Sequence, residues 1–112
     1  MAVGFAGEAT RVAEIGHLSP ADIARATGAD TSTVRAWLRD DQSPSGQRAE
    51  RLTELASIVE RLVDVMDPSY VPVWTRKPIR LLDDEKPLDL IAAGRFRDVS
   101  RVIAGLESMP AA

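Results

Sequence analysis

The sequence predicts an all-α protein, in which a helix-turn-helix bundle with a long central helix is followed by a small helical segment. Three observations support this fold class. Apolar residues recur every three or four positions along most of the 112-residue chain, prolines and glycines stand where helices would begin and end, and no segment shows the apolar–polar alternation of a strand. With 45% hydrophobic residues, the chain can bury a core and is not intrinsically disordered.

The first two helices are expected at residues 5–17 and 20–28. The apolar positions of the first helix are Phe5, Ala9, Val12 and either Ile15 or Gly16. The second helix has Ser19 as its N-cap, Pro20 at its first position and Asp22 in its first turn, and all three stabilise a helix N-terminus. Gly28 ends this helix, because glycine readily adopts the left-handed conformation found after the last helical residue.

A third helix follows the run Thr31-Ser32-Thr33, which we expect to cap it. Together the second and third helices carry the spacing of a helix-turn-helix, in which a small residue permits a close crossing and a glycine forms the turn. The residues with this spacing, separated by 4, 6 and 3 positions, are Ala24, Gly28, Val34 and Trp37. The sequence therefore predicts helix-turn-helix geometry for residues 20–39.

The outward face of the third helix is the candidate DNA-binding surface. With Val34 and Trp37 inward, the residues expected to point outward are Ser32, Thr33, Arg35, Ala36 and Arg39. Arginines on such a face suit guanine edges or phosphates in the major groove. However, residues 19–39 have a net charge of only +1 and Asp40-Asp41 follows, whereas phosphate contacts supply most DNA affinity. Two interpretations stay open: a structural or assembly module, and weak or partner-assisted DNA binding.

A long helix is predicted from Gln47 to Met66, before the Asp67-Pro68 stop. Its apolar residues are spaced 3, 4, 3 and 4 positions apart at Leu52, Leu55, Val59, Leu62 and Met66, and the stripe is widened by Ile58, Val63 and Val65. The plain interpretation is a central core helix, and the sharper one adds a homodimer seam along the same stripe.

The C-terminal part differs in character, and we divide the chain functionally into residues 1–67 and 68–112. Residues 70–78 are apolar but interrupted by prolines. Pro87 opens a short helix that Gly94 ends, a last helix carries Phe96, Val99, Val102, Ile103 and Leu106, and residues 108–112 follow it. The first part holds 11 acidic and 7 basic residues and the second 6 and 7, so the acidity of the chain belongs to the first part and the second is nearly neutral.

Composition argues against an enzyme. There are no cysteines and the single histidine is His17, so no catalytic, cofactor or metal site is expected. The three carboxylates of residues 83–85 are adjacent in a turn and cannot all face one ion, so we expect a solvated turn. No signal peptide and no apolar stretch of about 18–20 residues is present, and we expect a cytoplasmic protein without membrane contact.

The C-terminal part also carries a recognisable order of residues: Trp74, Pro78, Leu82, Pro87, Leu90-Ile91, Gly94, Val99 and Ile103. This order resembles the toxin-binding domain of the Xre/MbcA/ParS antitoxins, whose pattern is W-L-x-x-P-N-x-x-L-x-G-x-x-P-x-x-L-L followed by a glycine and a closing helix. The resemblance covers about residues 18–107. The chain departs from the pattern at Thr75 in place of leucine, at Ile79 in place of asparagine, and at Asp83-Asp84 in place of the glycine turn.

The resemblance implies a type II antitoxin whose partner is a RES-domain toxin that consumes NAD. It implies an Xre/Cro-like helix-turn-helix part that mediates homo-oligomerisation and, in many members, binds operator DNA to repress its own operon. It also implies a C-terminal domain that packs on the toxin, with the end of the last helix and residues 108–112 occluding the NAD pocket. The alternative function is a stand-alone helix-turn-helix transcriptional regulator with a C-terminal dimerisation or sensing segment.

The toxin-binding residues expected on this basis lie in the C-terminal part: Trp74, Arg95, Phe96, Val99, Ile103, Ser108, Met109, Pro110, Ala111 and Ala112. For the two aromatic residues the sequence leaves two interpretations open, because aromatics at helical spacing usually pack inward but are also favoured in protein interfaces. For residues 108–112 the alternative to occlusion is simple fraying of the chain end.

Overall fold

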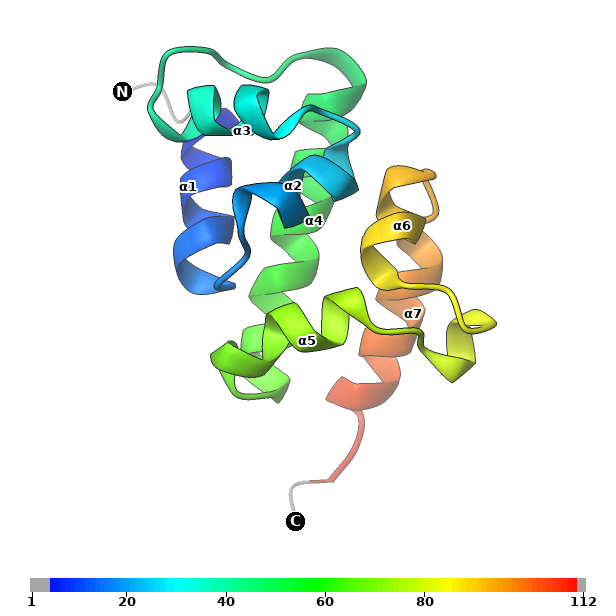
Figure 1. Ribbon diagram of the computed structural model, residues 1–112. Helices are drawn as coiled ribbons and strands as arrows, with labels where there is room; N and C mark the ends of the chain where they lie inside the picture. Colours follow the sequence, from blue (N-terminus) through cyan, green and yellow to red (C-terminus); the bar gives the residue numbers. More distant parts are fainter. Residues whose placement is uncertain (1–4, 111–112) are drawn as a thin grey trace.

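The computed structural model describes residues 5–110, and within them the chain forms seven α-helices, two short 3₁₀ helices and no strand (Figure 1). The predicted all-α class is confirmed. The elements are α1 Phe5–Ile15, α2 Pro20–Thr27, α3 Thr31–Leu38, α4 Gly46–Val65, η1 Pro68–Tyr70, α5 Val71–Arg76, η2 Arg80–Leu82, α6 Pro87–Ala92 and α7 Phe96–Glu107. The expected core role of the Phe5 side chain and the expected contacts of Ala111 and Ala112 lie outside the described residues.

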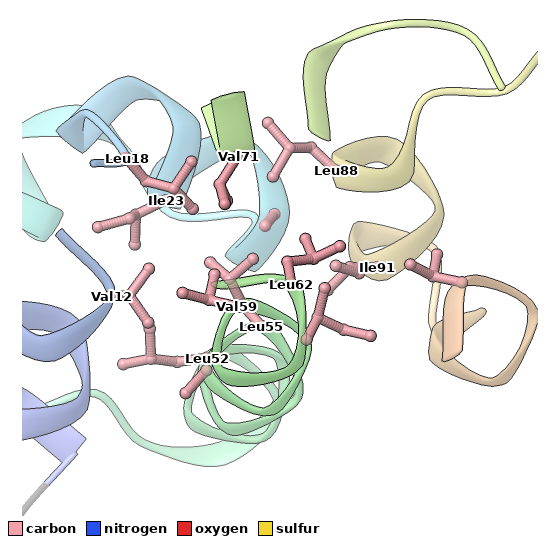
Figure 2. Close-up of a cluster of buried hydrophobic side chains, with 14 of the residues drawn as sticks. Val12, Leu18, Ile23, Leu52, Leu55, Val59, Leu62, Val71, Leu88 and Ile91 are labelled. Carbon is pink, nitrogen blue, oxygen red and sulfur yellow. The ribbon is translucent and has the colours of Figure 1, made fainter. Parts of the chain in front are cut away.

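The long helix α4 is the centre of the molecule. It passes between α1 and α2 on one side and α6 and α7 on the other, and α5 packs near its C-terminal end (Figure 1). Its buried side chains meet those of both sides in one continuous cluster (Figure 2), and they include Leu52, Leu55, Ile58, Val59 and Leu62. The core interpretation of this helix is therefore confirmed. Neighbours on two sides within one chain account for the width of its apolar stripe, and the homodimer seam stays a prediction.

The end of α1 lies close against α4 because the residue there is glycine. Gly16 is buried, and a Cβ atom at this position would lie 2.7 Å from Val59 Cγ1. Ala9 and Val12 are buried on the same side, whereas Ile15 is partly exposed. Of the two residues that the apolar spacing allowed at this point, Gly16 is therefore the one that faces the core.

The α2 helix is capped as its sequence predicts. The Ser19 hydroxyl accepts a hydrogen bond from the Asp22 backbone N–H, and the Asp22 carboxylate accepts one from the Ser19 N–H, which together make a capping box. Gly28 follows the helix with a φ of 78°, in the left-handed region. Ala24, Val34 and Trp37 are buried, so three of the four positions with helix-turn-helix spacing lie on the inner side of the α2–α3 pair, while Gly28 is exposed at the turn between the helices.

Two expectations for α3 are wrong. The residue at its N-cap is Asp30, without a side-chain capping bond, and Thr31 is already the first helical residue. Ala36 was expected on the outer face but is only 8% exposed. The loop after α3 folds back over Ala36, and the Ala36 carbonyl oxygen accepts hydrogen bonds from the Asp41 and Gln42 N–H groups. Because α3 has only eight residues, this loop can reach most positions of the helix.

The segment 70–78, to which the sequence pattern assigned no helix, contains α5. Pro72 occupies the first turn of this helix, where its missing N–H group leaves no hydrogen bond unmade. Thr75, which replaces a leucine of the family pattern, is fully buried, and its hydroxyl donates to the Pro72 carbonyl oxygen at 3.0 Å. The segment to which the sequence assigned no helix is therefore a short helix with one internal hydrogen bond from a side-chain hydroxyl.

The acidic turn after η2 is a tight loop. Asp83 and Asp84 have φ values of 56° and 63°, and Ile79 forms an isolated antiparallel bridge with Glu85 across the turn. The family pattern has a glycine here, which suits a left-handed residue, and aspartate is among the few other residues that tolerate this region. All three carboxylates of the turn are exposed, as expected for a solvated turn.

Candidate functional site

The outer face of α3 is polar and close to electrically neutral. Ser32 and Arg35 are exposed, and Thr33 is half-buried. Arg39 is exposed, but its Nε donates to the Asp41 carboxylate at 2.9 Å, so part of its hydrogen-bonding capacity is already used within the chain. The structure therefore brings four of the five expected residues to or near one surface and removes Ala36 from it.

The C-terminal part is tied to the N-terminal helices by two bidentate arginine–carboxylate pairs. Arg76 of α5 donates from Nε and Nη2 to both oxygens of Asp22 at 2.8 and 2.5 Å. Arg25 of α2 makes the same arrangement with Asp89 of α6, at 2.5 and 2.8 Å. Planar guanidinium groups match carboxylates in this way, which fixes orientation as well as distance. The packing of α6 on α2 is thus set by paired charges around a shared apolar core.

The Asp22 carboxylate is the more buried member of these pairs, with 9% of its side chain exposed. Burial raises its pKa, but the hydrogen bonds from Arg76 and from Ser19 lower the pKa by more, so it lies below the ordinary value. The ionised form of Asp22 is therefore the one that the fold stabilises. The Asp22 carboxylate caps α2 and also binds Arg76 of α5. It therefore links the start of the α2–α3 pair to the C-terminal part.

The helix α7 is held on α4 by a third arginine. Arg61 donates from Nη2 and Nε to the two carboxylate oxygens of Glu107, at 2.7 and 3.1 Å, and from Nη1 to the Ser100 hydroxyl at 2.6 Å. The hydrogen bonds from Arg61 lower the pKa of Glu107. The C-terminal turn of α7 is thus fixed in place immediately before residues 108–112.

The outer surface of η2 and α7 is the second candidate site. A pocket of about 300 Å³ opens between them, and its lining residues are Leu81, Leu82, Asp83, Arg95, Asp98, Arg101 and Val102. Leu81 projects from the rim with 81% of its surface exposed, and Met109 beyond the end of α7 is 67% exposed. Exposed leucine and methionine next to arginines are typical of protein-binding surfaces rather than of an ordinary solvated face.

The residues expected to bind a toxin separate into two groups. Arg95, Ser108, Met109 and Pro110 are exposed, and Phe96 is half-buried. Trp74, Val99 and Ile103 are buried in the core. These three side chains present no surface to a partner and can influence binding only by positioning α5 and α7, because apolar groups at helical spacing face the neighbouring helices.

Sequence reasoning missed Leu81 and the polar residues beside it, Asp98 and Arg101. A signal for Leu81 was present, since adjacent residues in a short turn point in different directions and Leu82 alone is needed for the core. For Asp98 and Arg101 the only signal was their helical spacing from Arg95, at three and six positions along α7. That spacing places them on one side of the helix but does not reveal a pocket.

Residues 5–110 contain neither a candidate metal site nor a membrane-spanning helix. Among residues 5–110 no group of three histidine, cysteine, aspartate or glutamate residues has the arrangement needed to hold a metal ion. No helix within the same range is long and apolar enough to cross a membrane.

The fold and its two surfaces define a small all-helical protein in which the α2–α3 pair and a C-terminal surface with a pocket are joined by one long helix. Its backbone matches the antitoxin fold of a solved complex, described as the crystal structure of the M. tuberculosis MbcT–MbcA toxin–antitoxin complex. The match has a TM-score of 0.84 and 26% sequence identity and covers 99% of this chain and 100% of that chain.

Sequence comparison agrees with the structural match. The chain is 36% identical over 78 residues to a probable mycobacterial cidal antitoxin of Mycobacterium tuberculosis, covering 70% of this chain and 66% of that protein. It is 32% identical over 81 residues to the mycobacterial cidal antitoxin MbcA of Mycobacterium bovis and of M. tuberculosis, covering 72% of this chain and 69% of those proteins. No protein-family model matches the sequence. The chain belongs to the MbcA family of mycobacterial cidal antitoxins.

Proposed function

We propose that this protein is the antitoxin of a type II toxin–antitoxin pair and that it neutralises a RES-domain toxin that degrades NAD. In this proposal the C-terminal part packs on the toxin, residues 108–112 cover its active site, and the chain itself carries no catalytic group. The observation that carries the proposal is the match over 99% of the chain to an antitoxin structure described from a toxin–antitoxin complex.

The geometry at the end of α7 supports occlusion by the residues that follow. Arg61 fixes the last turn of α7 through Glu107, so the chain leaves the helix from a defined position. Ser108, Met109 and Pro110 are then exposed. A small residue followed by an unbranched methionine fits irregular apolar cavities, because the methionine side chain adapts its shape at low cost.

The proposal is tested by co-expression with the toxin encoded beside this gene. We expect the tagged antitoxin to pull down the toxin and to restore both growth and the cellular NAD level. A toxin that remains active and unbound in the presence of this protein contradicts the proposal.

Occlusion is tested separately by ending the chain after Glu107. We expect this deletion to weaken neutralisation strongly while the α-helical circular dichroism is unchanged, because the deleted residues that the structure describes make few contacts. Unchanged neutralisation would refute occlusion and leave the antitoxin function intact.

DNA binding by α3 is the second candidate function. Its biological role would be repression of the protein's own operon. The exposed Ser32 and Arg35 favour it, whereas the Arg39–Asp41 pair weakens the positive potential of the face. If α3 contacts an operator, the double change Arg35→Ala and Arg39→Ala abolishes the electrophoretic shift of promoter DNA and leaves toxin binding unchanged. Absence of a shift with the wild-type complex on its own promoter rejects this function.

A further inference from the structure

We infer that the pocket between η2 and α7 is a recognition site for the toxin, which inserts an apolar side chain beside Leu81 and pairs a carboxylate with Arg101. The inference rests on the proposed antitoxin function and adds to it a site outside residues 108–112. It assigns a binding role to Leu81 and Arg101, which are not among the toxin-binding residues expected from the sequence.

Leu81 is held out in solvent by a well-ordered loop. The Ile79 N–H group donates to the Glu85 carbonyl oxygen at 3.1 Å, and the Asp84 N–H group donates to the Ile79 carbonyl oxygen at 3.0 Å. Leu82, the next residue, is buried and anchors the loop in the core. A leucine presented on a loop that is already ordered gains the full benefit of burial on binding, because little conformational entropy remains to be lost.

The pocket beside Leu81 has room for one partner side chain. Its volume of about 300 Å³ lies between apolar groups of Leu81, Leu82 and Val102 and the charged groups of Asp83, Arg95, Asp98 and Arg101. An apolar floor with charged residues at the rim is the usual composition of a pocket that anchors a protein interface.

The rim carries two acidic and two basic side chains, and among them the exposed Arg101 is the group that suits an acidic neighbour of that side chain. Asp98 accepts a hydrogen bond from Arg95 Nε at 2.8 Å through one of its two carboxylate oxygens. Arg101 lies 3.9 Å from the same carboxylate, makes no hydrogen bond to any described residue and has 80% of its side chain exposed. A guanidinium with five unused donors at the edge of an apolar pocket is suited to a carboxylate from the partner.

The position of the pocket on α7 identifies the toxin as the occupant. Val102 precedes Ser108 by six residues, about 9 Å along the helix axis. A stable protein interface covers about 800 Å² on each partner, an area equal to a disc about 16 Å in radius. A toxin whose active site receives residues 108–112 is therefore close enough to cover Val102 and its pocket as part of the same interface.

The experiment measures the affinity of purified full-length protein for a catalytically inactive variant of the toxin encoded beside it. We expect Leu81→Ala to weaken binding about tenfold or more, as for a buried anchor, and Arg101→Gln to weaken it about fivefold with a smaller salt dependence. The matched controls are Val73→Ala, an exposed apolar residue on α5, and Arg48→Gln, an exposed arginine on α4, and both should stay within about twofold of wild type.

The outcomes separate this inference from the proposed function. If wild type binds tightly and Leu81→Ala and Arg101→Gln bind equally well, the recognition site is refuted and the antitoxin function stands. If wild type does not bind the toxin, both are refuted. If the two variants change self-association in sedimentation experiments but not toxin affinity, the occupant is a second copy and the inference is overturned. Thermal melts of Leu81→Ala and Arg101→Gln should match wild type, because both residues are exposed.

Discussion

The outer faces of α3 and α7 are both short helical surfaces with exposed arginines, yet they differ in what surrounds those arginines. On α3 the neighbours are polar or acidic, and Arg39 is already paired with Asp41. On the α7 side, Leu81 and Met109 are exposed large apolar residues, and a pocket separates Leu81 from α7. The difference supports our proposal that the C-terminal surface binds a protein partner, whereas the polar and nearly neutral α3 surface offers few contacts to DNA.

The two surfaces nevertheless depend on the same core. α4 contacts α1 and α2 on one side and α6 and α7 on the other, and the buried cluster runs through all of them (Figure 2). A substitution in α4 should therefore affect both surfaces. A substitution at the ion pairs between helices, or on the surface of α7, should affect one surface more than the other.

The largest effect is expected for Leu62→Ala in α4. Leu62 is completely buried, and removing its side chain should lower the free energy of unfolding by about 2–5 kcal/mol. The chain has one tryptophan in each part, Trp37 and Trp74. In urea, the tryptophan that remains in the Trp74→Phe variant reports the unfolding of residues 1–67, and the one that remains in the Trp37→Phe variant reports the unfolding of residues 68–112. We expect coincident transitions that shift together. Two separate transitions would show that residues 1–67 and 68–112 unfold independently.

An intermediate effect is expected for Arg76→Ala, which leaves the mostly buried Asp22 without its arginine. We expect a loss of about 1–2 kcal/mol near neutral pH, since Arg76 is half exposed and the Ser19 bonds to Asp22 remain. Arg25→Ala breaks the more exposed pair with Asp89 and should cost less than about 1 kcal/mol. Chemical denaturation of both variants measures the difference, and equal costs would contradict the role given to Asp22.

The pH dependence of the same change follows from the lowered pKa of Asp22. Because the folded-state pKa lies below the ordinary value of 3.8, the stabilisation by ionised Asp22 is complete above that value and is lost as the pH falls through the lower folded pKa. The stability difference between wild type and Arg76→Ala should therefore be constant at neutral pH and shrink in acid. A difference that grows in acid would contradict this assignment.

The smallest effect is expected for Gly105→Ala on α7. No atom lies within 4 Å of a Cβ placed there, and alanine is favoured over glycine in a helix interior by about 1 kcal/mol. The free protein should therefore become slightly more stable, with a melting temperature raised by a few degrees, and Ala104→Gly should lower it by a similar amount. Loss of toxin affinity in Gly105→Ala despite the added stability would extend the interface to this part of α7.

The sequence predicted the helices that have strong local signals. These signals are the capping box at Ser19, the left-handed Gly28 and the apolar spacing of α4. Each depends on residues within one or two helical turns, so it can be predicted from the sequence. α5 was missed because Pro72 resembles an interruption, although in the first turn of a helix it is harmless.

The surfaces were harder to predict because exposure depends on parts of the chain that are distant or loop-like. Ala36 is covered by its own following loop, and Trp74 is covered by helices from the rest of the core. Leu81 is exposed because its loop is closed by two aspartates in left-handed conformation, which no apolar pattern encodes. Residue type and spacing thus identified the family, while the division between core and surface required the three-dimensional packing.

Hydrogen–deuterium exchange of the antitoxin, free and bound to its toxin, tests most directly which of the two surfaces the toxin covers. We expect added protection at residues 79–85 and along α7 to residue 110, and no change along residues 31–39 of the α3 face. Protection confined to α3, with residues 79–85 and α7 exchanging as in the free protein, would contradict the assignment of the C-terminal surface to the toxin.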